Sequence, residues 1–170
     1  MNSVFTTYSE RYTYPYAQGT MKLYAKDKSW FRVCFTVANM STYKRYHVGC
    51  IAVLNHRIIS SGYNTCKSEP LQKEFNSVRF SDTGRMYCNH TSHAEVKCLK
   101  PLMQNNDVKM SKVKLYIGRT RKNGTPALAR PCISCMKMIK ESGIRWIYYS
   151  GDNEYFKEDV VTGKMIRLVP

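Results

Sequence analysis

Two short stretches decide how this chain is interpreted: Ser92-His93-Ala94-Glu95 and Pro131-Cys132-Ile133-Ser134-Cys135. They offer one imidazole, two thiols three residues apart, and a carboxylate two residues past the imidazole. Zinc binds imidazole nitrogen and thiolate sulfur, and a catalytic zinc typically keeps three protein ligands and leaves its fourth position to water. His93, Cys132 and Cys135 supply such a set, which leaves Glu95 to move protons beside it.

Each half of the pattern has a plainer explanation when it stands alone. The first half also fits a capping box, in which Ser92 is the N-cap of a helix and Glu95 reaches back to its amide. The cysteine pair is also typical of a thioredoxin-type redox site. A purely structural zinc is a further alternative, with a fourth ligand from Cys98 or His90 closing the site. The three-ligand set with a spare carboxylate favours an open, catalytic site over these alternatives.

The cysteine pair is expected at the start of a helix. Pro131 suits the first turn of a helix, and Cys132 and Cys135 then lie on one face of that turn, where the helix dipole stabilises thiolates. The combined pattern resembles the H-x-E…P-C-x-x-C signature of the zinc-dependent nucleobase deaminases, from about residue 48 to residue 151. That family includes cytidine, deoxycytidylate, guanine, tRNA-adenosine and polynucleotide cytosine deaminases. Among these the chain most resembles the deoxycytidylate (dCMP) deaminases.

The resemblance assigns roles to individual residues. It implies one catalytic Zn²⁺ on the three ligands named above, with Glu95 as the catalytic proton carrier. It also implies that Asn64, which follows a predicted strand, contacts the substrate, although Asn is equally at home in a turn. The backbone carbonyl or amide of Ala94 is expected to hold the base.

Two segments depart from the compact pattern of the family. A basic loop over residues 119–130 separates a predicted strand from the Pro-Cys motif and is expected to overhang the metal site. A charge run is often only a solvated turn, but phosphate contacts are possible from four side chains there: Arg119, Arg121, Lys122 and Arg130. Residues 65–92 form a long excursion that is interpreted as an insertion. Some dCMP deaminases carry a second, structural zinc in a comparable insertion. The candidate ligands here are Cys66, Cys88 and His90, for which free thiols are the simpler explanation.

Hydrophobic periodicity predicts alternating helices and strands, and hence an α/β protein. The expected segments are a helix over 21–40, a strand hairpin over 48–54 and 57–64, a helix from residue 93, a strand over 113–118, a helix over 131–142 and a strand over 144–149. Pro101 should kink the helix that begins at residue 93 or end it early. The resemblance implies a single-domain cytidine-deaminase-like fold, with a mixed central β-sheet and helices on its faces.

A length of 170 residues predicts one domain over residues 1–170, large enough to bury a core. Within it we expect a core over about 21–151, an N-terminal arm over 1–20, the insertion over 65–92 and a C-terminal tail over 152–170. In that tail, residues 165–169 are expected to add an edge strand or to pack down.

Composition limits the classes of partner. The net charge of +15 attracts phosphates and suits either nucleotides or a nucleic-acid backbone. No apolar run approaches the length of a membrane span, and the first residues do not resemble a secretory signal. The cysteines number seven, an odd count that favours a reducing compartment and hence the cytoplasm. The resemblance implies a homo-oligomer.

Three functions follow from these patterns. The first is a zinc-dependent hydrolytic deaminase that converts a cytosine nucleotide, dCMP to dUMP, with release of ammonia. The second is a deaminase acting on cytosine or adenine in single-stranded DNA or RNA, which the charge and the 13 tyrosines support because bases stack on aromatic rings. The third is a non-catalytic, zinc-stabilised nucleic-acid-binding module, in which Glu95 is only a helix cap.

Overall fold

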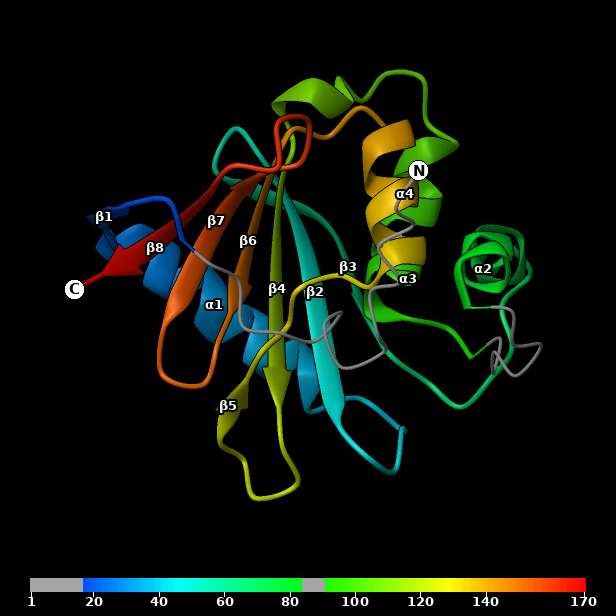
Figure 1. Ribbon diagram of the computed structural model, residues 1–170, viewed down its shortest axis with the longest axis horizontal. Coiled ribbons are helices and arrows are strands. Elements are labelled where there is room, and N and C mark those ends of the chain that lie inside the picture. The colour runs from blue at the N-terminus through cyan, green and yellow to red at the C-terminus, as the bar shows by residue number, and fades with distance from the viewer. Residues whose placement is uncertain (1–16, 84–90) are drawn as a thin grey trace, which may run out of the picture.

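A single mixed β-sheet runs through the protein, which is described by a computed structural model over residues 17–83 and 91–170. In spatial order its strands are β1 (Thr20–Lys22), β8 (Met165–Val169), β7 (Tyr155–Asp159), β6 (Trp146–Ser150), β4 (Lys114–Thr120), β2 (His47–Leu54) and β3 (Arg57–Tyr63), with β5 (Pro126–Ala127) paired to β4. The β4–β6 and β1–β8 pairs are parallel and the others are antiparallel. The expected β2–β3 hairpin and the mixed central sheet are confirmed (Figure 1).

Helices cover both faces of this sheet. The described α-helices are α1 (Ala25–Ala38), α2 (Pro70–Thr83), α3 (Ala94–Met103) and α4 (Ile133–Glu141), with a short 3₁₀ helix η2 (Met110–Lys112). Helix α1 lies on one face, α3 and α4 lie on the other, and α2 lies outside these two, against both of them (Figure 1). The chain is therefore the α/β domain with a mixed central sheet and helices on its faces that the sequence predicts.

Alternation along the central strands divides the core in two, because successive side chains of a strand point to opposite faces. Ile51 and Tyr116 pack in the cluster under α1, together with Phe31. Their neighbours Cys50 and Ile117 face α3 and α4 and join the larger cluster. The period of two in the sequence thus places α1 on the face opposite to the helices that carry the metal motifs.

Two glycines bring helices into backbone contact with the sheet. A Cβ at Gly49 would lie 2.1 Å from the carbonyl oxygen of Cys34 in α1. A Cβ at Gly62 would lie 2.5 Å from the carbonyl oxygen of Ala94 and 2.5 Å from the amide nitrogen of Cys98, both in α3. Any side chain at these positions would push the helices away, so glycine sets the depth at which α1 and α3 sit.

Several element boundaries differ from the sequence predictions. Helix α1 begins at Ala25 rather than Met21, because residues 20–22 form β1 beside β8. Helix α4 begins at Ile133, two residues after Pro131, so Pro131 precedes the N-cap Cys132 and does not lie in the first turn as expected. Helix α3 continues through Pro101 and ends at Met103, two residues past it.

The expected insertion and the expected C-terminal tail both carry regular elements, and the strand expected over residues 165–169 is present as β8. The 65–92 excursion contains α2, and residues 155–169 form the β7–β8 hairpin, which extends the sheet. The first sixteen residues of the expected arm, and Cys88 and His90 of the excursion, lie outside the described residues. No helix in the described ranges is long and apolar enough to cross a membrane.

Candidate metal centre

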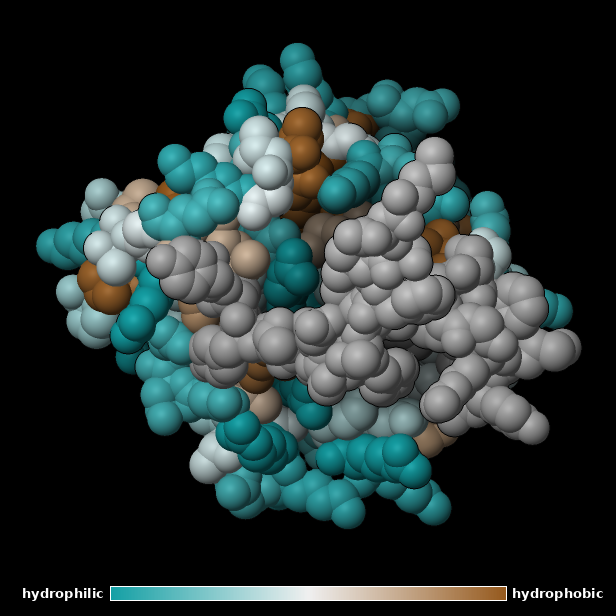
Figure 2. All heavy atoms as spheres, in the orientation of Figure 1, coloured by the Kyte–Doolittle hydropathy of each residue, from teal (hydrophilic) through white to brown (hydrophobic). Residues whose placement is uncertain are grey.

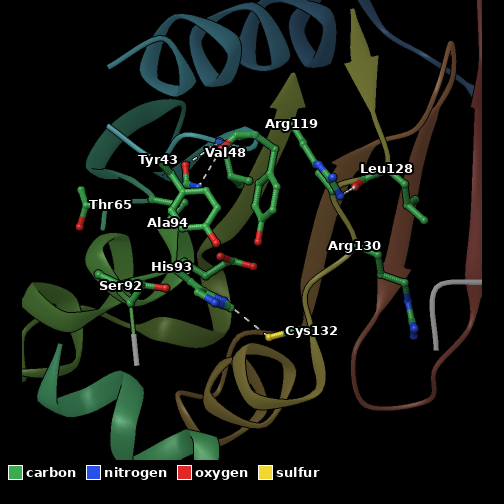
Figure 3. A pocket seen from close by; sticks show the side chains of 15 residues that line it. Tyr43, Val48, Thr65, Ser92, His93, Ala94, Arg119, Leu128, Arg130 and Cys132 are labelled. Carbon is green, nitrogen blue, oxygen red and sulfur yellow. Dashed lines mark hydrogen bonds between the residues drawn. The ribbon is translucent and has the colours of Figure 1, made fainter. Parts of the chain in front are cut away.

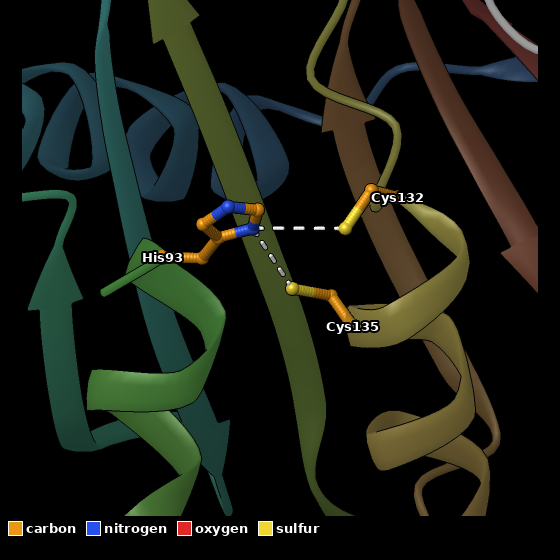
Figure 4. Close-up of side chains that lie close together, drawn as sticks. All are labelled: His93, Cys132 and Cys135. Atoms are coloured by element: carbon orange, nitrogen blue, oxygen red, sulfur yellow. Dashed lines mark hydrogen bonds between the residues drawn. The ribbon is translucent and has the colours of Figure 1, made fainter. Parts of the chain in front are cut away.

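The N-termini of α3 and α4 lie side by side and bring the predicted ligands together (Figure 4). His93 is the N-cap of α3, Cys132 is the N-cap of α4, and Cys135 lies in the first turn of α4. The Nδ1 atom of His93 lies 3.3 Å from Sγ of Cys135 and 3.6 Å from Sγ of Cys132. All three donor atoms lie within 4.8 Å of one another.

This donor set fits one zinc ion. Bond lengths of about 2.05 Å to nitrogen and about 2.3 Å to sulfur at a tetrahedral angle place the two atoms about 3.6 Å apart, close to the observed separations. Among the side chains that the structure describes, no other group of three His, Cys, Asp or Glu is close enough to hold a metal ion. Cys66 is exposed, with its thiol on the carbonyl of Thr42 at 3.4 Å, and Cys98 is buried in the core.

The capping-box interpretation of residues 92–95 is wrong. The N-cap is His93 rather than Ser92, and no side chain caps the helix. The backbone N–H of Ser92 donates to the carbonyl of Lys67 at 2.9 Å, and the N–H of His93 donates to Oε1 of Gln72 at 3.2 Å. Because both amides already have acceptors, the carboxylate of Glu95 has no capping role.

Glu95 is the buried acidic residue of the site. Its side chain is 5% exposed and belongs to the wall of a pocket that also includes His93 and Cys132. Burial raises the pKa of the Glu95 carboxyl, and the nearby His93 opposes that rise. A cation held by the three ligands would lower the pKa again, because a nearby positive charge favours the carboxylate. The arrangement places a buried carboxyl group beside the candidate metal donors.

The pocket opens between the metal ligands and the loop that precedes β2 (Figure 3). Of the predicted substrate and phosphate contacts, Asn64, Ala94, Arg119 and Arg130 line it. Arg121 and Lys122 are exposed in the turn of the β4–β5 hairpin and are not part of the lining. The expected basic overhang is therefore a hairpin whose two ends, rather than its tip, reach the pocket.

The side chain of Asn64 forms hydrogen bonds with several residues around the pocket. Its Oδ1 accepts from the backbone N–H of Val48 at 2.8 Å and from the hydroxyl of Ser41 at 2.7 Å. Its Nδ2 donates to the carbonyl of Tyr46 at 3.0 Å. The oxygen is thus occupied by the protein, and only the second hydrogen of the amide nitrogen remains to meet a ligand.

The two lining arginines have different partners. Arg130 forms two hydrogen bonds with the carboxylate of Glu158, of 3.0 and 2.8 Å, and its side chain points away from His93 (Figure 3). The guanidinium of Arg119 lies 4.4 Å from the ring centroid of Tyr46, and its Nε is buried without a hydrogen-bond partner. Its Nη1 donates to the carbonyl of Leu128 at 3.4 Å, and within the described residues no carboxylate pairs with Arg119.

Sequence reasoning missed three residues of this region. Tyr43 and Tyr46 line the pocket and lie on either side of Lys44 and Arg45 in the sequence. This pair of aromatic residues within a basic connector is the sequence pattern that could have indicated them. Gln72 holds the backbone of His93 from α2, and nothing in its sequence context indicates that contact.

The fold and the His-Cys-Cys site together define a domain of the zinc-dependent deaminase class. The chain belongs to the family described as the cytidine and deoxycytidylate deaminase zinc-binding region, whose model matches residues 24–151.

Individual relatives agree with this membership. The chain is 27% identical over 143 residues to ComE operon protein 2 of Bacillus subtilis (strain 168), and the match covers 78% of this chain and 66% of that protein. The apo dCMP deaminase of the cyanophage S-TIM5 is similar over 76% of this chain and 84% of its own, with 23% identity and a TM-score of 0.50. Cytidine deaminase from Burkholderia pseudomallei is similar over 79% and 93%, with 10% identity and a TM-score of 0.54. At these identities the two structures show the shared fold.

Proposed function

We propose that this protein is a zinc-dependent hydrolytic deaminase that converts a cytosine nucleotide, dCMP to dUMP, with release of ammonia. The observation that carries the proposal is the buried carboxylate of Glu95 beside a three-ligand metal set in the wall of a pocket. A structural zinc site is normally closed by four protein ligands, and it needs no buried acid beside it.

Glu95 is the residue that moves protons in this proposal. Zinc, when bound, makes water acidic enough to act as a nucleophile near neutral pH. The carboxylate of Glu95 accepts one proton from the water that attacks the ring carbon bearing the amine, and passes it to the ring nitrogen. It then takes the second proton from the new hydroxyl on that carbon and passes it to the amine, so that the carbon–nitrogen bond breaks, ammonia leaves and a carbonyl remains.

The base is held by the backbone at the start of α3. The carbonyl of Ala94 faces Gly62 of the sheet, so the amide is the group of Ala94 that we assign to the base. The first N–H groups of a helix have no acceptor within it, which suits this role. Asn64 contributes at most one N–H to the substrate and otherwise holds the loop over residues 41–48 in place.

Arg119 is the phosphate contact that we propose among the four basic candidates. It lines the pocket, its Nη1 donates to the carbonyl of Leu128 at 3.4 Å, and no carboxylate of the described residues pairs with it, whereas the charge of Arg130 is matched by Glu158. Arg121 pairs with Asp152 outside the pocket. A guanidinium can bind phosphate through two parallel hydrogen bonds, which favours a nucleotide over a nucleoside.

A nucleic-acid substrate is the second candidate. The loop that supplies Tyr43 and Tyr46 to the pocket also exposes Lys44 and Arg45. The residues that Figure 2 colours by hydropathy are largely hydrophilic, and the net charge is +15. Aromatic rings beside exposed cations are typical of single-strand binding.

A substrate panel tests these functions. Zinc-loaded protein is incubated with dCMP, CMP, cytidine and single-stranded oligonucleotides. Mass spectrometry of the products then detects the gain of about 1 Da that results when oxygen replaces the amine. We expect conversion of dCMP, with turnover reduced about 10²- to 10⁴-fold in Glu95→Gln while zinc content stays unchanged.

The other outcomes separate the alternatives. Conversion of the oligonucleotides alone would favour the nucleic-acid deaminase. No conversion of any substrate by zinc-loaded protein would contradict the enzyme and favour a zinc-stabilised binding module. An unchanged rate in Glu95→Gln would remove Glu95 from the mechanism.

A further inference from the structure

We propose that Gln72 is a positioning residue for the metal ligand His93, so that α2 acts as a brace for the metal centre. The inference rests on the zinc site proposed above and assigns a task to the excursion that contains α2. Gln72 does not line the pocket and touches neither substrate nor metal. It acts through the backbone of His93.

The contact between α2 and the metal ligand is a buried hydrogen bond. Oε1 of Gln72 accepts from the backbone N–H of His93 at 3.2 Å, and Nε2 of Gln72 donates to Oδ1 of Asn76 at 3.0 Å. The two amide side chains are 0% and 2% exposed. A buried amide destabilises a protein unless it is hydrogen-bonded, so the inner face of α2 is built around its polar partners, of which the N–H of His93 is one.

Further bonds hold the residues just before His93. The N–H of Thr65 donates to the carbonyl of Ser92 at 3.0 Å, and the N–H of Ser92 donates to the carbonyl of Lys67 at 2.9 Å. Lys100 of α3 pairs with Glu69, just before α2, at 2.8 Å. The start of the excursion therefore contacts the chain both before His93, at Ser92, and after it, at Lys100.

The backbone of His93 matters because His93 is the N-cap of α3. An N-cap residue is only half in the helix, and the carbonyl of His93 accepts the N–H of Lys97 at 3.2 Å while its own N–H has no acceptor inside α3. Gln72 supplies that second point of attachment. Because α2 also packs against α4, which carries Cys132 and Cys135, the same helix holds both halves of the donor set.

Zinc affinity tests the proposal without any substrate. Gln72→Met keeps the length of the side chain and removes the amide acceptor. Partners that orient metal ligands typically account for about 10- to 100-fold in metal affinity, so we expect zinc affinity, measured by competition with a chelator, to fall by that factor. The visible absorption of the Co²⁺-loaded protein, which reports the geometry at the metal, should change as well.

Two further variants separate positioning from general support. Gln72→Glu keeps an acceptor oxygen for the N–H of His93 and should retain the affinity that Gln72→Met loses. Phe75→Leu trims a buried apolar side chain of the same helix. It should lower the free energy of unfolding and leave the zinc affinity and the Co²⁺ spectrum as they are in the wild type.

The proposal is overturned by either of two results. In the first, Gln72→Met binds zinc as tightly as the wild type. In the second, Phe75→Leu weakens zinc binding as much as Gln72→Met does, which would make α2 a general structural support. Failure of the wild-type protein to bind zinc would instead overturn the proposed function, and it is seen before any variant is made.

Discussion

Gly62 of β3 is the position where one added carbon tests the packing that places the metal ligands. In Gly62→Ala the new Cβ would lie 2.5 Å from the carbonyl oxygen of Ala94 and the amide nitrogen of Cys98, both in the backbone of α3. Ordinary contact begins at 3.4 Å, so α3 must move from β3 by about 0.9 Å, the difference between these distances. Overpacking of this kind costs about 1–3 kcal/mol, which for a chain of this size lowers Tm by about 2–12 °C.

The same displacement reaches the metal centre, because His93 directly precedes α3 while the cysteines lie on α4. Metal sites require ligand distances within about 0.2 Å, so we expect Gly62→Ala to weaken zinc binding as well as folding. Calorimetric unfolding with and without zinc measures the first effect, and chelator competition measures the second. Ser61→Ala, at an exposed position of the same strand, is the matched control. A Gly62→Ala protein with wild-type Tm and zinc affinity would refute this reasoning.

Three further predictions concern single side chains. Cys132→Ser should lose bound zinc by elemental analysis, and full occupancy in that variant would contradict the ligand assignment. Arg119→Met should raise KM for dCMP and leave the kinetics with deoxycytidine nearly unchanged, whereas Arg121→Met, outside the pocket, should leave both as they are; equal effects of the two variants would argue against a phosphate contact at Arg119. Arg130→Met should lower the free energy of unfolding in urea by about 1.5–3 kcal/mol, because it leaves a buried carboxylate without its charged hydrogen bonds. An unchanged urea midpoint would show that Glu158, 2% exposed, is stabilised by other groups.

The candidate metal donors were predictable because their chemistry and their local structure agree. His93 and the cysteine pair are residue types that bind zinc, and each stands where a helix begins. The β2–β3 hairpin was predictable for a similar reason, since a continuous apolar run is followed by a turn and a second strand. The hairpin and each half of the donor set depend on residues within a few positions of one another, whereas joining His93 to cysteines 39 and 42 positions away rested on the resemblance to the deaminase signature.

The strand β7 was hidden because its acidic side chains are buried against distant partners. Glu158 pairs with Arg130, and Asp159 pairs with Arg145 at 2.9 Å, with side chains 2% and 4% exposed. In the sequence these acidic residues suggest a solvated tail. Only in the folded sheet do Arg130 and Arg145 lie close enough to pair with them. The contact between Gln72 and His93 is hidden in the same way, since it joins residues far apart in the chain.

The hairpin after β4 had a signal that was interpreted too loosely. Asn123 and Gly124 form a dipeptide typical of tight turns, and Gly124 has a φ of +80°, which glycine adopts without strain. Read together with Pro126, this pair indicates two short antiparallel strands rather than an open basic loop. The pairing of β5 with β4 then accounts for how Leu128 and Arg130 return to the pocket.

The parallel pair of β1 and β8 has a consequence for the order in which the protein forms. Thr20–Lys22 lies beside Arg167–Val169 at one edge of the sheet (Figure 1). The first described strand, β1, therefore cannot pair until the last strand, β8, has been synthesised. During synthesis, the edge near α1 therefore stays open until residues 165–169 have left the ribosome. A stalled or shortened chain that ends before Met165 would leave both β1 and β7 with unpaired backbone groups, which are the surfaces that associate with other strands.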